Sequence, residues 1–284
     1  MLMALVSVVG GVFCLFLTTQ SELQIRRHLS SYVNAGALLG CLSSVLYFFV
    51  QVGAFNQSGL NGMFDTLMIS ILAQSGLGFS AFYRFIAFFL ILSLAIYKTR
   101  IGRKNEIIFG KFSLFIIFIA LLLLAYSFSL IGHVAELSLL ATIAIGFHIL
   151  AISLWLGSLY PLWYLCEHEK LENLKKIMQR FSELAMGFVA VLILSGVFLL
   201  TQLLESPLEL INTAYGLTLL SKLAGVSVLL FLGSLNKLRL VPGLTNDPGV
   251  RQLKLCISLE ISVGFIVLII TAYLTTLVGI SHSA

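Results

Sequence analysis

Eight long apolar segments constrain this chain more than any other feature of its sequence. A helix needs about 20 consecutive apolar residues to cross the hydrocarbon core of a bilayer. Segments of this kind lie at about residues 2–19, 32–54, 80–98, 111–131, 138–165, 182–204, 215–235 and 256–279. Because backbone polar groups in lipid must be paired within their own segment, each one is predicted to be a helix. The sequence therefore predicts an all-α, polytopic membrane protein with eight transmembrane helices, in a single domain over residues 1–284.

The composition excludes a soluble domain. Hydrophobic residues make up 59% of the 284 residues and charged residues only 10%, whereas charged residues are about a quarter of an ordinary soluble chain. The first segment is predicted to be a retained helix rather than a signal peptide, because no basic residue precedes Arg26 and no small-residue cleavage site follows the segment. Residues 56–79 are turn-rich and then moderately apolar, which predicts an outer loop or an interfacial helix.

The basic residues predict the orientation of the chain. Of the 17 basic residues, 15 lie in or beside alternate connections, on one side of the predicted membrane. They are Arg26, Arg27, Lys98, Arg100, Arg103, Lys104, Lys111, Lys170, Lys175, Lys176, Arg180, Lys237, Arg239, Arg251 and Lys254. The positive-inside rule places this side in the cytoplasm and both termini in the periplasm. The net charge of +5 thus reflects topology, and no nucleic-acid partner is expected.

Two cations do not follow this pattern. Arg84 and Lys222 lie a few residues inside the third and seventh segments, near the outer face. Either these side chains extend to the membrane interface, or they pair with outer carboxylates such as Asp65, Glu136 or Glu205 and hold an outer vestibule together. The residues leave both interpretations open.

The richest stretch for function is residues 133–163, which places histidines, a glutamate and tryptophans in or beside a very apolar segment. An ionisable side chain at membrane depth is costly and marks a functional hypothesis by default. His148 and Trp155 are two helical turns apart and share a face. Ala144 and Ala151 beside His148 let a neighbouring helix come close. We expect the imidazole to face the bundle interior; the alternative is a histidine that only hydrogen-bonds between helices.

The two histidines of this stretch are expected at different depths. His148 lies about 11 residues into the fifth segment, roughly 16 Å along a helix, whereas His133 precedes that segment. Imidazole suits copper, so we interpret the pair as two stations rather than one coordination sphere. Glu136 on the outer turn could orient His133. Glu260 lies closer to the inside, and intramembrane carboxylates commonly mark ion or proton paths.

Several short motifs follow one another in a specific order. They are Gly132-His133; His148 with Trp155 and Gly157; Arg180-Phe181-Ser182 with Leu184-Ala185; Ser195-Gly196; Thr213, Tyr215 and Gly216 followed by Lys222-Leu223; Asn236 with Arg239 and Pro242; and Glu260. Over about residues 60 to 275 the chain resembles the copper resistance D family of bacterial inner-membrane proteins. The resemblance implies a multi-pass inner-membrane protein that transports or delivers copper, with a small periplasmic copper-binding protein as a partner.

Under this resemblance, copper ligands are predicted at two residues, with five others in support. The ligands are His133 and His148, and the supporting residues are Glu136, Trp155, Arg84, Lys222 and Glu260. The sulfur side chains are better explained by packing. Met63 and Met68 are five residues apart, a poor spacing for one helical face. The four cysteines, Cys14, Cys41, Cys166 and Cys256, form no C-x-x-C pair, and all are expected in the inner half of the membrane or at its inner boundary, as reduced thiols.

Two other functions fit the same residues. The first is a b-type haem electron carrier, with one haem shared by His133 and His148. The second is a structural or assembly partner that transports nothing. The chain contains no nucleophile–base pair and no ATP-binding motif, so we do not expect an enzyme. Any transport must then use a gradient or passive flow.

Overall fold

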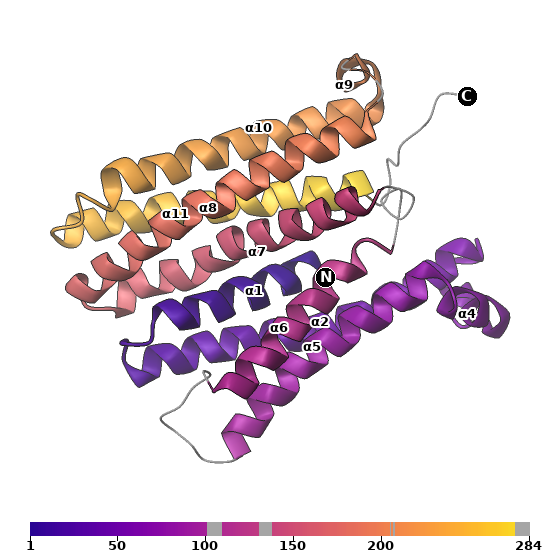
Figure 1. The fold of residues 1–284 in the computed structure, drawn as a ribbon, viewed down its shortest axis with the longest axis horizontal. Helices are drawn as coiled ribbons and strands as arrows, with labels where there is room; N and C mark the ends of the chain where they lie inside the picture. Colours follow the sequence, from indigo (N-terminus) through magenta and orange to yellow (C-terminus); the bar gives the residue numbers. More distant parts are fainter. Residues whose placement is uncertain (101–109, 131–137, 205, 207, 276–284) are drawn as a thin grey trace.

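The computed structural model describes residues 1–100, 110–130, 138–204, 206 and 208–275, and every regular element in them is a helix (Figure 1). The elements are α1 (Leu2–Leu17), α2 (Leu23–Phe55), α3 (Gly59–Gly62), α4 (Thr66–Ala73), α5 (Gly76–Arg100), α6 (Lys111–Ser127), α7 (Leu139–His168), α8 (Leu171–Leu203), α9 (Glu209–Asn212), α10 (Ala214–Leu235), the π-helical turn η2 (Asn236–Leu240) and α11 (Asp247–Tyr273). The all-helical prediction is confirmed for these residues.

Six helices among the described residues are long and apolar enough to cross a membrane. They are α2, α5, α7, α8, α10 with η2, and α11. Two further apolar helices are shorter: α1 has 16 residues and α6 has 17. A polytopic membrane protein is therefore supported, while the number of eight crossings and the position of the termini stay predictions.

Helix α1 lies at the centre of the molecule and packs on both α2 and α7 (Figure 1). On one side, α2 packs on α5 and α5 on α6; on the other, α7 packs on α8 and α11, and α11 on α10. Most side chains of α1 are buried, and Leu5, Val8 and Leu15 are exposed by 1% or less. A short helix thus joins an N-terminal group of helices to a C-terminal group.

The contact between α1 and α7 depends on two glycines. A Cβ built at Gly10 would lie 2.1 Å from the backbone carbon of Gly157, and a Cβ built at Gly157 would lie 1.9 Å from the carbonyl oxygen of Val6. The two backbones therefore touch with no side chain between them, which is the packing that small residues permit in membrane helices.

Several helices begin at a capping side chain, because the first N–H groups of a helix have no partner within it. The carboxylate of Asp65 accepts from the N–H of Met68 at 2.8 Å and starts α4. Thr213 Oγ1 accepts from Gly216 at 2.9 Å and starts α10. Asn246 Oδ1 accepts from Gly249 at 3.0 Å and starts α11.

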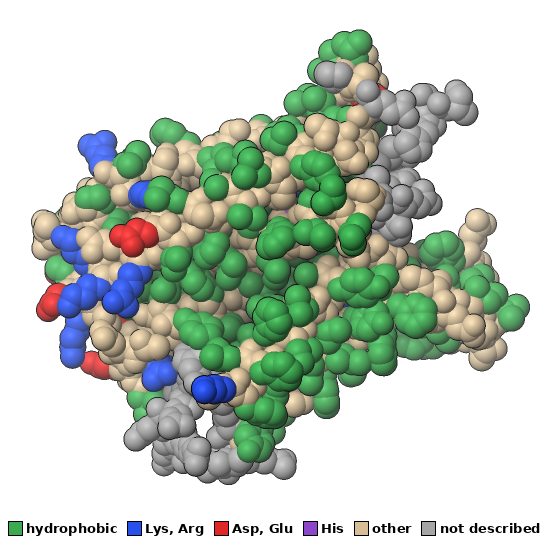
Figure 2. All heavy atoms as spheres, in the orientation of Figure 1, with side chains coloured by type: hydrophobic (Ala, Val, Ile, Leu, Met, Phe, Trp, Pro, Cys, Tyr) green, Lys and Arg blue, Asp and Glu red, His purple; other side chains and the backbone are tan. Residues whose placement is uncertain are grey.

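Charged side chains gather at one end of the bundle, and apolar side chains cover the rest of the face seen in Figure 2. The charged end holds the α1–α2, α7–α8 and η2–α11 connections (Figure 1). Exposed ion pairs lie there, such as Lys170 with Glu22 at 3.0 Å. Away from it, large apolar residues face outward; Leu39 and Leu46 of α2 are 59% and 62% exposed. Such a surface suits lipid, which is the environment that the hydropathy predicted.

Candidate functional site

The imidazole of His148 faces the interior of the bundle, toward α8, and is only half-buried there. Its Nδ1 lies 3.1 Å from Ser195 Oγ, and a Cβ added at Gly196 would lie 3.3 Å from its Cε1. The ring therefore sits between α7 and α8 at the Ser195-Gly196 pair. This is the orientation expected from the small residues around it, and Ala151, one turn further along, is buried at 4% exposure.

Ser195 is the hydrogen-bonding partner of the His148 ring. The Ser195 hydroxyl has one proton, and it donates to the carbonyl oxygen of Val191 at 2.6 Å. In the tautomer that carries its proton on Nδ1, the imidazole donates to Ser195 Oγ and the lone pair is on Nε2. A polar partner on one ring nitrogen is the usual arrangement behind a histidine that binds a metal through the other.

The charge near His148 comes from Lys222 on α10, which acts on the imidazole electrostatically. Lys222 is partly buried, and in the described part of the chain no carboxylate lies within ion-pair distance of it. The described residues also contain no group of three or more His, Cys, Asp or Glu side chains placed to hold a metal. His148 therefore supplies one nitrogen ligand for a metal, and the side chain of Lys222 near it is positively charged. Two of the predicted site residues, His133 and Glu136, lie outside the described residues.

A second polar group lies further along α7, around Trp155. Trp155 is 4% exposed and Glu260 of α11 is 2% exposed. Both flank Gly233 of α10, where an added Cβ would lie 3.3 Å from Trp155 Cζ2 and 3.6 Å from Glu260 Oε1. The amide Nδ2 of Asn236 donates to Glu260 Oε1 at 3.0 Å. The structure thus brings Trp155 and Glu260 together, with Asn236 as the hydrogen-bonding partner between helices.

Arg84 lies apart from this group, on α5 in the N-terminal half. It is 4% exposed, so it does not extend to the interface. Its Nε donates to Ser127 Oγ at 3.0 Å, its Nη1 lies 3.1 Å from Met1 Sδ, and its guanidinium lies 4.3 Å from the ring centre of Phe128. Asp65, one of the carboxylates suggested for it, caps α4 instead. Arg84 therefore binds polar groups of the helix ends rather than the His148 region.

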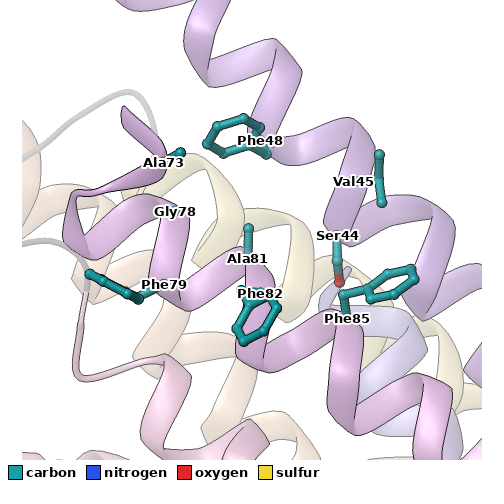
Figure 3. Close-up of a pocket in the computed structure, with 9 residues that line it drawn as sticks. All are labelled: Ser44, Val45, Phe48, Ala73, Gly78, Phe79, Ala81, Phe82 and Phe85. Carbon is teal, nitrogen blue, oxygen red and sulfur yellow. The ribbon is translucent and has the colours of Figure 1, made fainter. Parts of the chain in front are cut away.

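The other polar and sulfur candidates have ordinary surroundings. Met63 packs against Gly53, and Glu183 is exposed on α8. The four cysteines are free and buried. A pocket of about 450 Å³ lies between α2 and α5, where Phe79, Phe82 and Phe85 line it with Val45 and Phe48 (Figure 3). Its lining is apolar and contains none of the predicted site residues, so it does not extend the polar site.

Two protein-family models match most of the chain. Residues 1–140 match the family model described as copper resistance protein D-like, N-terminal domain. Residues 175–274 match the model described as copper resistance protein D. No curated protein and no solved structure matches the chain. The two models together span α1 to α6 and most of α8 to α11, and the chain belongs to the copper resistance protein D family.

Proposed function

We propose that the protein transports or delivers copper across a bacterial inner membrane, with copper as its cargo and no reaction catalysed. The observation that carries the proposal is the geometry of His148: the ring points into the bundle, and its Nδ1 lies 3.1 Å from Ser195 Oγ, so that the tautomer protonated on Nδ1 offers the lone pair of Nε2. A neutral imidazole nitrogen is a suitable donor for copper. Membership of the copper resistance protein D family supports copper as the ion.

In the proposed topology all eight apolar helices cross the membrane, including α1 and α6, and both termini are periplasmic. The gathering of Lys and Arg at one end of the bundle (Figure 2) supports a cytoplasmic location for that end. Copper then enters at the opposite end, from a small periplasmic copper-binding protein. His133 is the proposed outer ligand, with Glu136 to orient it, and His148 is the deeper one.

Beyond His148 the proposed route follows α7 toward Trp155 and Glu260. His148 and Trp155 are about 10 Å apart along the helix axis, so they serve successive positions of the ion rather than one. Lys222 has a role in this scheme because its charge opposes a cation at His148. A like charge makes the binding of copper at His148 weaker than it would be at the histidine alone, which favours passage over storage.

The test is copper retention by the purified full-length chain. We expect the wild type to hold copper after chelator washing. His148→Ala and His133→Ala are each expected to weaken binding by about 10- to 100-fold, a typical cost of disturbing a metal site. His168→Ala is the matched control, because His168 is on the same helix but is exposed and bonded to the carbonyl of Tyr164.

Two results would contradict the proposal. A wild type that retains no copper, or a His148→Ala variant that retains as much as the His168→Ala control, removes its basis. A Soret band in the purified protein would instead identify a haem protein. A colourless protein that binds no metal and co-purifies with another membrane complex would identify an assembly partner.

A further inference from the structure

A group of polar side chains lies between Trp155 and the charged end of the bundle. It contains a sulfur donor, Cys256, that the site described above does not use. Cys256 and Glu260 are four residues apart on α11, and so they lie on the same face of that helix. Asn236 lies opposite them, and its Nδ2 donates to Glu260 Oε1 at 3.0 Å. The Cys256 thiol donates to the carbonyl oxygen of Leu232 at 3.9 Å, and the Asn236 side chain acts on that thiol as a neighbour. The cluster therefore places a thiol, a carboxyl group and a carboxamide together.

Burial makes this cluster unusual for a packing contact. Cys256 is 6% exposed and Glu260 is 2% exposed. In the described part of the chain no Lys, Arg or His lies within ion-pair distance of Glu260. Asn236 Oδ1 is buried and has no hydrogen-bonding partner there. Buried polar groups are normally satisfied, and a buried carboxyl group normally has a cation or hydrogen bonds to all of its lone pairs. A bound cation would satisfy both the carboxyl group and the carboxamide oxygen.

The backbone at this point supports a ligand site as well. Asn236 is the first residue of the π-helical turn η2, which follows α10 directly. Single π-helical turns are rare and often occur at functional sites. Gly233, one turn earlier, leaves room for both the Trp155 ring and the Glu260 carboxyl group. The indole thus closes the cluster on the side that faces His148.

We propose that Cys256, Glu260 and Asn236 form a further, inner copper station, with Cys256 Sγ as its main donor. The inference rests on the proposed function, which makes copper the cargo. Thiolate is one of the soft ligands that suit Cu(I), and the carboxyl and carboxamide oxygens complete a mixed sulfur and oxygen set. Binding of Cu(I) releases the thiol proton to water, so one positive charge replaces another at the sulfur. An ion that leaves His148 would pass Trp155 and reach this station next.

The experiment is copper K-edge X-ray absorption, with metal analysis, on the full-length protein loaded with Cu(I) under reducing conditions. We expect a sulfur contribution in the wild type and its loss in Cys256→Ser, together with a lower content of bound copper. Glu260→Gln should keep the sulfur contribution and weaken retention by about 10- to 100-fold. Cys14→Ser is the matched control, because Cys14 is fully buried on α1, where its thiol donates to the carbonyl oxygen of Ser158 at 3.8 Å.

The outcomes separate this inference from the proposed function. If the wild type retains copper through His148 but its sulfur contribution is unchanged in Cys256→Ser, the inner station is refuted and the proposed function stands. If the wild type binds no copper, both fail. Should Cys256→Ser not fold, alkylation of the wild type decides: Cu(I) must protect Cys256 from a maleimide more strongly than it protects Cys41, and equal protection would refute the station.

Discussion

Replacing Gly157 by alanine tests the central contact of the fold. A Cβ at this position would lie 1.9 Å from the Val6 carbonyl oxygen, 2.8 Å from the Val6 carbonyl carbon and 3.0 Å from the Cα of Gly10. All three are backbone atoms, so no side chain can rotate away. The only relief is a movement of α1 away from α7.

The size of that movement sets the expected cost. Ordinary contact requires at least 3.4 Å, so the distance from the new Cβ to the Val6 oxygen must grow from 1.9 Å by about 1.5 Å. Overpacking a well-packed interior typically costs about 1–3 kcal/mol. Because this contact is between two rigid backbones, we expect about 3 kcal/mol. For a chain of this size that loss corresponds to roughly 6–12 °C in melting temperature.

The four buried cysteines provide a convenient assay. Because all four thiols are free and buried, a thiol-reactive dye reports the unfolding of the detergent-solubilised protein on heating. Gly187→Ala is the control, since nothing lies within 4 Å of a Cβ at that position in α8. It should melt at or slightly above the wild-type temperature. A Gly157→Ala protein that melts within about 2 °C of this control would refute the contact between α1 and α7.

Two further substitutions probe the buried cations. Lys222→Met should strengthen copper retention at His148 roughly tenfold, because like charges inside a protein repel by about 1–3 kcal/mol. Competition with a chelator measures this retention. Weaker retention in the variant would mean that Lys222 helps to bind the ion. Arg84→Met removes the hydrogen bonds to Ser127 and should lower the free energy of unfolding by about 2–3 kcal/mol, while the copper stoichiometry stays unchanged. Thermal melting measures the first effect and metal analysis the second. A loss of copper with full stability would place Arg84 on the copper route.

The helices could largely be predicted from hydropathy, but their ends could not. The second segment was expected to begin at residue 32, whereas α2 begins at Leu23. Hydropathy reports which residues prefer lipid, and a helix can continue through the polar residues beyond them. The contact of Gly10 with Gly157 could not be predicted, because it depends on how two distant helices are aligned along their axes.

The candidate site was predictable one residue at a time rather than as an arrangement. The small residues beside His148 indicated that its ring faces inward, but its partner Ser195 depends on how α7 is aligned with α8. Glu260 was expected as an intramembrane carboxyl group that marks an ion or proton path, but its hydrogen bond with Asn236 depends on how η2 lies against α11. Cys256 was expected to be ordinary packing, since nothing in its spacing indicates that η2 brings Asn236 beside it.

The central place of α1 also has a consequence for biosynthesis. Cys14 of α1 meets Ser158 of α7, a partner 144 residues later in the chain. At about 5–20 residues per second, the ribosome needs roughly 7 to 30 seconds to make that partner after the first helix has emerged. Of the helices described above as packing on α1, only α2 has been made during most of this interval. The surface of α1 around Gly10, which later packs on α7, therefore stays uncovered during this time. A mutation in α7 that prevents the contact would leave the first helix of the new chain exposed to quality control.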